Sequence, residues 1–227
     1  MSISDKLTTI AENVQKVYEA GKVAGGSGGD SEFWNVHQEN GTRTHYSYGF
    51  YDWRWEYANP LYKCNVTGCS YMFYGSKKLK NLNPEKFNFE MCLNLTNTFQ
   101  NCALLEELPF IFSGLQLSST FRGCTSLQRI GGLDFSRMSS TNNTNAFTDC
   151  TALEEIGEIT GNITWNGFNV QWSPLTHETL LKIINALSDK TTDTSGTTYT
   201  LTLGATNVAK LTEAELDIAY SKGWLIA

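Results

Sequence analysis

A ten-residue pattern that occurs four times constrains the fold of this 227-residue chain more than any other feature. Each copy has phenylalanine first, cysteine or serine fourth, leucine seventh, and leucine or isoleucine tenth. The copies begin at Phe73, Phe99, Phe121 and Phe147, so their starts are 26, 22 and 26 residues apart. A period in the twenties predicts a solenoid of stacked units, because one such unit cannot bury its apolar face alone. Solenoids present extended surfaces, so the pattern favours a binding protein over an enzyme.

Residues 71–170 are assigned to the repeats. Phenylalanines and leucines at equivalent positions should be buried and stacked in register: Phe99, Phe121, Phe147, Leu105, Leu127 and Leu153. The last two apolar residues of each copy should bracket a short strand. Parallel stacking of these strands would place Arg129 between Glu107 and Glu155, which suits cross-strand ion pairs.

Residues 1–23 are expected to form an amphipathic helix that mediates oligomerisation. Its apolar residues are spaced alternately by four and three, as in a coiled-coil seam: Ile3, Leu7, Ile10, Val14 and Val17. A helix this short is marginal in water and needs a partner. Self-association into a dimer or trimer is the leading interpretation, and docking on the repeats or on another protein are the alternatives. Residues 24–32 are rich in glycine and serine and predict a flexible linker.

Residues 33–74 hold nearly half of the chain's aromatic residues. Residues 33–70 are expected to form an N-terminal cap built on a degenerate repeat, because Phe50 lies 23 residues before Phe73. The aromatic side chains either fill this cap or form an exposed platform for a glycan or protein. Since the cap cannot enclose all of them, the candidates for ligand contact are Tyr46, Tyr48 and Tyr74.

One aromatic triplet in this segment is expected to face inward: Trp53, Trp55 and Tyr57. In an extended segment these rings share one face, and Arg54 and Glu56 share the other. Burying the two charged residues instead would cost several kcal/mol per ion.

Residues 171–227 change in character and predict an α/β cap for the end of the repeats. Thr176 should begin a helix whose apolar side carries Leu180, Ile183, Ile184 and Leu187. Alternation around Tyr199–Leu203 predicts a strand. Thr212 and Glu215 form a capping box at the start of a second helix, Gly223 ends it, and a final strand should follow.

The six cysteines are expected to be free, structural thiols with no disulfide and no bound metal. Three of them occupy one repeat position: Cys102, Cys124 and Cys150. Cys64 and Cys69 are five residues apart, a spacing that matches no common zinc motif. No nucleophile–base pair, metal-ligand set or phosphate-binding loop is evident, so neither a cofactor nor an enzymatic activity is expected.

Charge and hydropathy exclude two classes of partner. The net charge of −6 and the pI near 5.1 argue against nucleic-acid binding, which needs a basic surface. No run approaches 18 consecutive apolar residues, so insertion into a membrane is not expected. The first residues have no apolar region typical of a secretory signal, which favours assembly inside the host cytoplasm.

The repeat resembles the BspA-like leucine-rich repeat family, of the type encoded by gut Firmicutes and their phages. Met72-Phe73 and Leu133-Asp-Phe-Ser136-Arg-Met138 match the style of that family. The opening Met-Ser-Ile-Ser-Asp-Lys-Leu and the closing Gly223-Trp224 are similar to repeat proteins encoded by phages and by the genomes of gut Firmicutes. The resemblance implies a leucine-rich-repeat solenoid with short parallel strands, an N-terminal helix and an α/β C-terminal cap.

Known members of that family are surface adhesins that bind host proteins or glycans. The function expected here is therefore a non-enzymatic recognition or adhesion module, displayed on a phage virion as part of its tail or an appendage. Its expected partners are copies of itself, other virion proteins, and a host-surface protein or glycan. The alternative is a structural or adaptor protein that docks on a larger assembly through its N-terminal helix.

Overall fold

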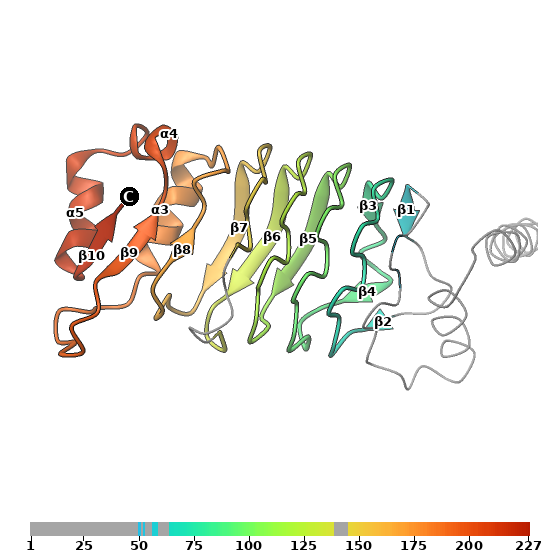
Figure 1. Ribbon diagram of the computed structural model, residues 1–227, viewed down its shortest axis with the longest axis horizontal. Helices are drawn as coiled ribbons and strands as arrows, with labels where there is room; N and C mark the ends of the chain where they lie inside the picture. The colour runs from blue at the N-terminus through green and yellow to red at the C-terminus, as the bar shows by residue number, and fades with distance from the viewer. Residues whose placement is uncertain (1–49, 51, 53–55, 59–63, 139–144) are drawn as a thin grey trace, which may run out of the picture.

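The computed structural model describes residues 50, 52, 56–58, 64–138 and 145–227 (Figure 1). Within these residues, short parallel strands in small sheets combine with a few helices, so the fold is an α+β mix. The strands are β1 (Tyr57–Ala58), β2 (Cys64–Asn65), β3 (Asn81–Leu82), β4 (Phe87–Asn88), β5 (Glu107–Phe112), β6 (Arg129–Asp134), β7 (Glu155–Thr160), β8 (Phe168–Asn169), β9 (Tyr199–Thr202) and β10 (Trp224–Ile226). The helices are α3 (His177–Asn185), α4 (Ala205–Val208) and α5 (Glu213–Ser221).

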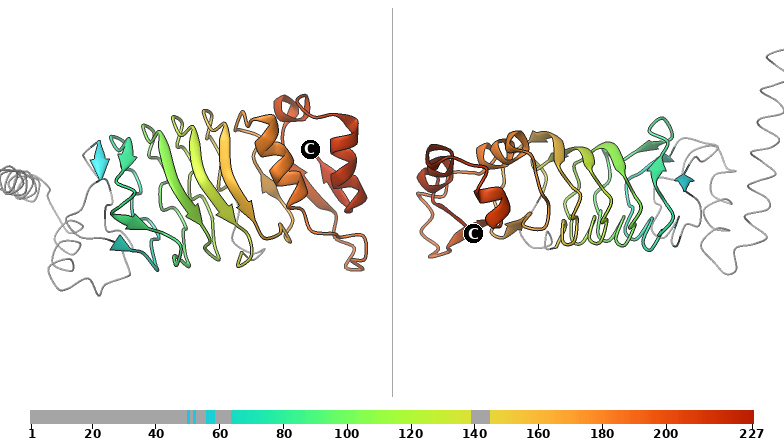
Figure 2. Two further views of the ribbon diagram at one scale, coloured as in Figure 1. Left: turned by 180° about the vertical axis from the view of Figure 1, so that it is seen from behind. Right: turned by 90° about the horizontal axis from the view of Figure 1, so that it is seen from above.

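The strands form four small sheets, and all their pairings are parallel. β5, β6 and β7 make the central sheet, β8, β9 and β10 make the C-terminal one, and β1–β3 and β2–β4 are isolated pairs. Figures 1 and 2 show these strands side by side along the long axis, with the helices gathered at the C-terminal end. The expected N-terminal helix (1–23) and linker (24–32) lie outside the described residues.

The central strands begin later than the repeat pattern predicted. β5 starts one residue before Leu108 and continues four residues beyond it, so the strand is not bracketed by the two leucines of the pattern. The reason is local: the Leu105 N–H donates to the Cys102 carbonyl, 3.1 Å away, and this turn keeps Leu105 out of the extended conformation. The predicted register is nevertheless confirmed, because Glu107 pairs with Arg129 and Arg129 pairs with Glu155.

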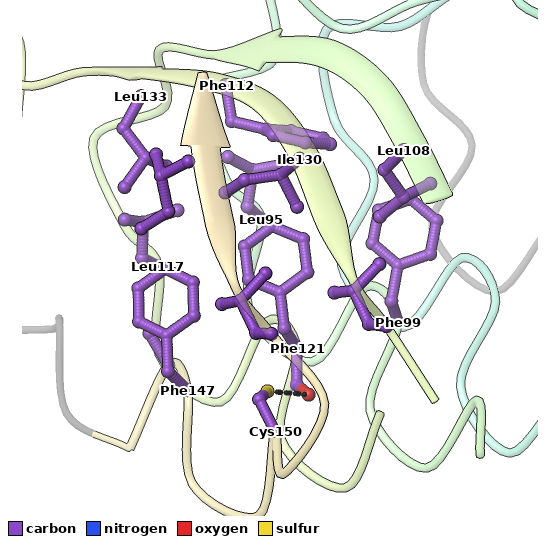
Figure 3. Close-up of a cluster of buried hydrophobic side chains, with 14 of the residues drawn as sticks. Leu95, Phe99, Leu108, Phe112, Leu117, Phe121, Ile130, Leu133, Phe147 and Cys150 are labelled. Atoms are coloured by element: carbon purple, nitrogen blue, oxygen red, sulfur yellow. Dashed lines mark hydrogen bonds between the residues drawn. The ribbon is translucent and has the colours of Figure 1, made fainter. Parts of the chain in front are cut away.

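A row of stacked phenylalanines forms the centre of the core. The ring centroids of Phe73, Phe99, Phe121 and Phe147 are 5.4, 6.0 and 5.4 Å apart in sequence order, and all four side chains are fully buried. The predicted burial of the equivalent leucines is also confirmed. Figure 3 shows Phe99, Phe121 and Phe147 in line beneath the apolar residues of the central strands.

The Phe row continues toward the N-terminus as predicted for a degenerate repeat. The Phe50 ring is fully buried and stacks on Phe73 with a centroid distance of 4.7 Å. At the other end, Phe168 meets Phe147 edge-on at 6.0 Å, so parallel stacking stops there.

The cysteine or serine position of each repeat hydrogen-bonds to the preceding repeat. The thiols of Cys102, Cys124 and Cys150 each donate to the backbone carbonyl of the first phenylalanine in the previous copy, at a distance of 3.0 Å. Figure 3 shows this bond for Cys150. In the first copy the Ser76 hydroxyl donates to the Phe50 carbonyl over 3.1 Å. A small side chain with one donor fits this buried site, which explains why both serine and cysteine are found there.

The prediction that all cysteines are free is wrong for one pair. A disulfide joins Cys69 and Cys92, whereas Cys64 and the three thiols of the repeat position are free and buried. Cys92 does not occupy the repeat position, so aligning the copies could not reveal its partner. Adjacent repeats bring the two cysteines together. The Leu93 N–H donates to the Thr67 carbonyl, 2.9 Å away; Cys92 directly precedes Leu93, and Cys69 lies two residues after Thr67.

A bulge in β5 requires glycine on the neighbouring strand. The pairing of β5 with β6 shifts between Leu108 and Ile111, so β5 carries one extra residue there. Gly131 lies opposite, and a Cβ at this position would come within 2.8 Å of the Phe110 backbone nitrogen and oxygen. Glycine is therefore needed at position 131 because the β5 and β6 backbones lie so close together there, and not because of its conformational freedom.

The C-terminal segment begins as the last rung of the repeats and then becomes helical. The Thr176 N–H donates to the Glu154 carbonyl over 2.8 Å, and its hydroxyl accepts from the Thr179 N–H at the start of α3. The predicted apolar face of α3 is buried. The capping box of Thr212 and Glu215 at α5 is also present, as predicted.

Buried polar side chains fasten the C-terminal elements together. The Asn207 side-chain amide donates to the Ser173 and Leu203 carbonyls over 2.8 and 3.0 Å. The Trp224 indole N–H donates to the Ser188 carbonyl over 2.8 Å. The predicted final strand is β10, which pairs with β9.

Candidate recognition surface

Each repeat makes a turn with left-handed residues on both sides of its phenylalanine. Two residues before the ring, φ lies between 53° and 59° at Tyr71, Asn97, Ser119 and Asn145. Two residues after it, φ lies between 51° and 75° at Asp52, Gly75, Asn101, Gly123 and Asp149. Glycine and short polar residues tolerate this conformation, because they have no Cβ or can bond locally.

Tyr71 is the exception in this turn. Its φ is 58°, whereas the three equivalent positions hold asparagine or serine. The left-handed conformation costs an ordinary L-residue about 1–2 kcal/mol, and bulky residues are uncommon in it. The molecule therefore keeps an aromatic side chain where the backbone favours a small polar one.

Tyr71 packs against Tyr74 within the same turn. The two ring centroids are 5.6 Å apart with planes inclined by 46°, and both side chains are half-buried. In the next repeat the equivalent residues are Asn97 and Gln100, and the later ones carry no aromatic residue at either position. The aromatic pair thus belongs to the first of the four copies alone.

The tyrosine pair lies beside the N-terminal end of the Phe row. Phe50 already covers the exposed side of Phe73, and both of these rings are fully buried. Tyr71 and Tyr74 lie beside this stack and retain partial exposure.

Asp52 adds a carboxylate to the same place. Its backbone N–H donates to the Tyr74 carbonyl over 2.8 Å. A Cβ on Gly75 would clash with the Asp52 Oδ1 atom, so the carboxylate fills the space that the missing Cβ leaves. The exposed Asp52 therefore borders the tyrosine pair.

The outer side of the strands carries exposed charges in pairs. Arg129 Nε lies 3.1 Å from a Glu155 oxygen and Arg129 Nη1 lies 3.9 Å from a Glu107 oxygen, which confirms the predicted cross-strand pairing. Lys80 and Glu56 form a further pair at 3.0 Å. These side chains are about half exposed, so each pair contributes little to stability, and this surface is solvated and predominantly acidic.

The structure places only part of the predicted site. Tyr74 is half-buried and paired with Tyr71, whereas Tyr46, Tyr48 and the five residues of the expected oligomerisation seam lie outside the described residues. Tyr71 and Asp52 were not predicted. A signal for Tyr71 existed in the sequence, because Tyr48 precedes Phe50 by two residues just as Tyr71 precedes Phe73.

The inward orientation predicted for the aromatic triplet is wrong at Tyr57. This side chain is 48% exposed, and its strand neighbour Ala58 is buried instead. The pairing of β1 with β3 sets this orientation, since it gives the single inward position of the short strand to Ala58. Trp53 and Trp55 lie outside the described residues.

Neither a cluster of metal ligands nor an activated thiol of the repeat position is found among the described residues. Within it, no three side chains of histidine, cysteine, aspartate or glutamate are grouped to hold a metal ion. Burial raises the pKa of the Cys102, Cys124 and Cys150 thiols, that of Cys150 to about 12, so they stay protonated at neutral pH. Among the described helices, none is long and apolar enough to cross a membrane.

Comparisons of the chain with protein-family models, with curated proteins and with solved structures found no match.

Proposed function

We propose that this chain is a non-enzymatic recognition module whose repeats form a leucine-rich-repeat solenoid of the BspA-like type. The observation that carries the proposal is the Tyr71–Tyr74 pair, which keeps a bulky residue in a left-handed turn beside the core. Residues held in strained backbone conformations are concentrated at functional sites. Tyrosine at a partly exposed position is also typical of binding surfaces.

Backbone hydrogen bonds support the solenoid. A single series of N–H to carbonyl bonds of 2.7 to 3.0 Å connects six successive rungs: Glu56, Lys80, Glu106, Gln128, Glu154 and Thr176. Together with the Phe row, this series indicates that each unit contacts mainly its two neighbours.

The solenoid can be tested by changing the number of repeats. Duplicating residues 99–120 inserts one complete unit, so the variant should fold cooperatively with a melting temperature at least equal to the parent's. Duplicating residues 99–109 adds half a unit and should abolish cooperative unfolding. A full duplication that unfolds the protein as thoroughly as the half duplication would refute the architecture.

We place this module on a phage particle because of the terminal sequence similarities and the apolar seam of residues 3–17. Self-association through the seam would present several recognition surfaces together and convert weak contacts into avidity. Charged residues in place of Leu7 and Val14 should yield a monomer by light scattering while the circular dichroism of the repeats persists. An unchanged mass would refute the oligomerisation role. Antibody detection in purified particles tests the location.

Binding to whole cells tests the recognition function directly. Fluorescently labelled full-length protein should bind at least one member of a panel of gut Firmicutes, and Tyr74→Ser should weaken that binding at least tenfold. Tyr220→Ser is the control, because Tyr220 is an exposed tyrosine on α5, at the other end of the molecule. Incorporation into particles without any cell binding would overturn recognition and favour the adaptor role.

A further inference from the structure

We infer that Cys69 and Cys92 form a reversible redox switch that sets how readily the first repeat, the copy that begins at Phe73, opens within an otherwise unchanged fold. The inference does not depend on the proposed recognition function, because it concerns a disulfide inside the core. Three observations carry it: the equivalent corner of the next repeat, the polar groups around the two sulfur atoms, and the exposed turn that contains Cys92.

The next repeat fills the same corner without a covalent bond. When the copies are aligned on their phenylalanines, Cys69 corresponds to Leu95 and Cys92 corresponds to Gly114. A Cβ on Gly114 would come within 2.8 Å of Leu95 Cδ1, so the leucine side chain occupies the space beside the glycine. Apolar packing therefore closes the second corner, and the architecture does not need a crosslink at the first.

Backbone hydrogen bonds hold the crosslinked segments side by side independently of the disulfide. The Leu93 N–H donates to the Thr67 carbonyl over 2.9 Å. Four residues further along the first segment, the Tyr71 N–H donates to the Thr96 carbonyl over 3.0 Å. Because neither bond involves a sulfur atom, both should persist when the disulfide is reduced.

The polar groups around the two sulfur atoms suit the reduced pair. The Sγ atoms of Cys69 and Cys92 lie 3.3 and 3.4 Å from the Asn94 carbonyl oxygen. A disulfide sulfur has no proton to donate, so the sulfur atoms can donate to this acceptor only as thiols. The Thr98 hydroxyl lies 3.6 Å from Cys69 Sγ and can donate to it. Reduction therefore creates thiols that already have hydrogen-bonding partners, which lowers its cost in the buried site.

The surroundings of the two cysteines differ in exposure. Both cysteines are fully buried, but Met91 and Leu93, on either side of Cys92, are 62% and 42% exposed. The residues on either side of Cys69 are buried or half-buried. Local opening of the exposed turn therefore brings Cys92 to solvent before Cys69, and a small thiol should attack Cys92.

Reduction consumes two molecules of a small thiol such as glutathione. The thiolate of the first attacks Cys92 Sγ, the bond between the two cysteines breaks, and Cys69 leaves as a thiolate that takes a proton from solvent. The second thiolate attacks the glutathione sulfur of the mixed disulfide and releases Cys92, which is protonated in turn, together with glutathione disulfide. The pair thus gains two electrons and two protons, and oxidation by glutathione disulfide is the reverse.

The crosslink ties the first repeat to the second. It joins residues 23 apart in the sequence, so it restricts the chain when the first repeat opens. Terminal units of a repeat array open most readily, and the crosslink acts at this end of the Phe row. Reduction should therefore raise the population of molecules in which the first repeat is open, and leave the last copy unaffected.

Equilibration of the native full-length protein in glutathione buffers of graded ratio tests reversibility. Acid trapping, alkylation and mass spectrometry should show one two-electron transition between the disulfide and the dithiol, while the far-UV circular dichroism stays that of the oxidised protein. The inference is overturned if reduction abolishes that spectrum, or if the disulfide is reduced only in denaturant.

The alkylation rate of Cys64 under native conditions tests the switch. This buried thiol lies five residues before Cys69, and it should react at least tenfold faster in the reduced protein, after removal of the reductant, than in the oxidised one. Cys150, in the last copy, should react at the same rate in both. Equal rates at Cys64 in the two states would overturn the inference.

The matched control is the double variant Cys69→Leu/Cys92→Gly, which copies Leu95 and Gly114 of the next repeat. The same treatment with reductant should leave its Cys64 rate unchanged. An equal acceleration in this variant would show that the reductant acts elsewhere, and would overturn the switch.

Two single variants test the order of attack. Cys69→Ser keeps the Cys92 thiol and Cys92→Ser keeps the Cys69 thiol. With glutathione disulfide, Cys69→Ser should form its mixed disulfide at least tenfold faster than Cys92→Ser, because the Cys92 turn is the more exposed. A faster reaction at Cys69 would overturn the assignment of Cys92 as the attacked residue.

Discussion

Removal of one ring from the middle of the Phe row gives the sharpest test of the core. Phe121 is fully buried, with the Phe99 and Phe147 rings on its two sides at 6.0 and 5.4 Å. The Phe112 ring meets it edge-on at 5.2 Å. In Phe121→Ala these three neighbours lose their shared contact at once.

The expected loss of unfolding free energy is about 3–5 kcal/mol. The upper part of that range is favoured, because each flanking ring belongs to its own rung and cannot collapse into the cavity without breaking the parallel register. For a chain of this size such a loss lowers the melting temperature by roughly 6–20 °C. The variant should remain folded at low temperature where the parent's stability lies in the middle or upper part of the usual range of about 5–15 kcal/mol.

Urea unfolding followed by far-UV circular dichroism measures the loss. Phe121→Leu is the graded control, since it keeps most of the buried volume and should cost less than the alanine variant. Tyr220→Ser is the surface control and should lie within about 0.5 kcal/mol of the parent. A loss below about 1 kcal/mol in Phe121→Ala would show that the ring is not part of a packed row, and the repeat core would have to be abandoned.

Further outcomes concern the bulge, the disulfide and a helix cap. Gly131→Ala should destabilise the protein by about 1–3 kcal/mol in the same urea assay, because its new Cβ would press on the Phe110 backbone. An unchanged unfolding free energy would refute the close approach of the two backbones. Thiol titration under denaturing, non-reducing conditions should count four free groups, and a count of six would refute the Cys69–Cys92 disulfide. Reducing this disulfide should lower the unfolding free energy by about 3 kcal/mol, because the loop that it closes is then unconstrained in the unfolded chain. The pKa of Glu215 is lowered chiefly by the backbone N–H at the N-cap of α5. Its stabilising contribution is therefore present above about pH 4.3 and lost as the pH falls further. Glu215→Gln should consequently reduce the pH dependence of the unfolding free energy below that value. A variant whose unfolding free energy depends on pH as the parent's does would contradict the cap.

Features that depend on periodicity or on local hydrogen bonds could be predicted from the sequence. The Phe row follows from one residue type at a regular spacing, since equivalent positions must stack when the units are parallel. The caps at Thr176 and Thr212 involve bonds that span three residues, so their chemistry is visible in a short window.

Features that depend on contacts between unlike positions could not be predicted. Cys69 and Cys92 occupy different places in their units, so the pair appears only when the path of the chain is known. The outward orientation of Tyr57 follows from a two-residue pairing with β3, which no alternation reveals. Tyr71 was missed because its importance lies in φ, and a left-handed tyrosine contradicts the propensity on which a prediction would rest.

The buried thiols also give the protein a built-in set of kinetic reporters. Cys64, Cys102, Cys124 and Cys150 are spread along the row of units, and an alkylating reagent can reach each one only when its own unit opens. Opening free energies in a one-dimensional array fall toward the ends. Alkylation of the native protein should therefore begin at Cys64 and reach Cys124 last, so that mass spectrometry of the labelled sites reads out a stability profile along the chain without any introduced probe.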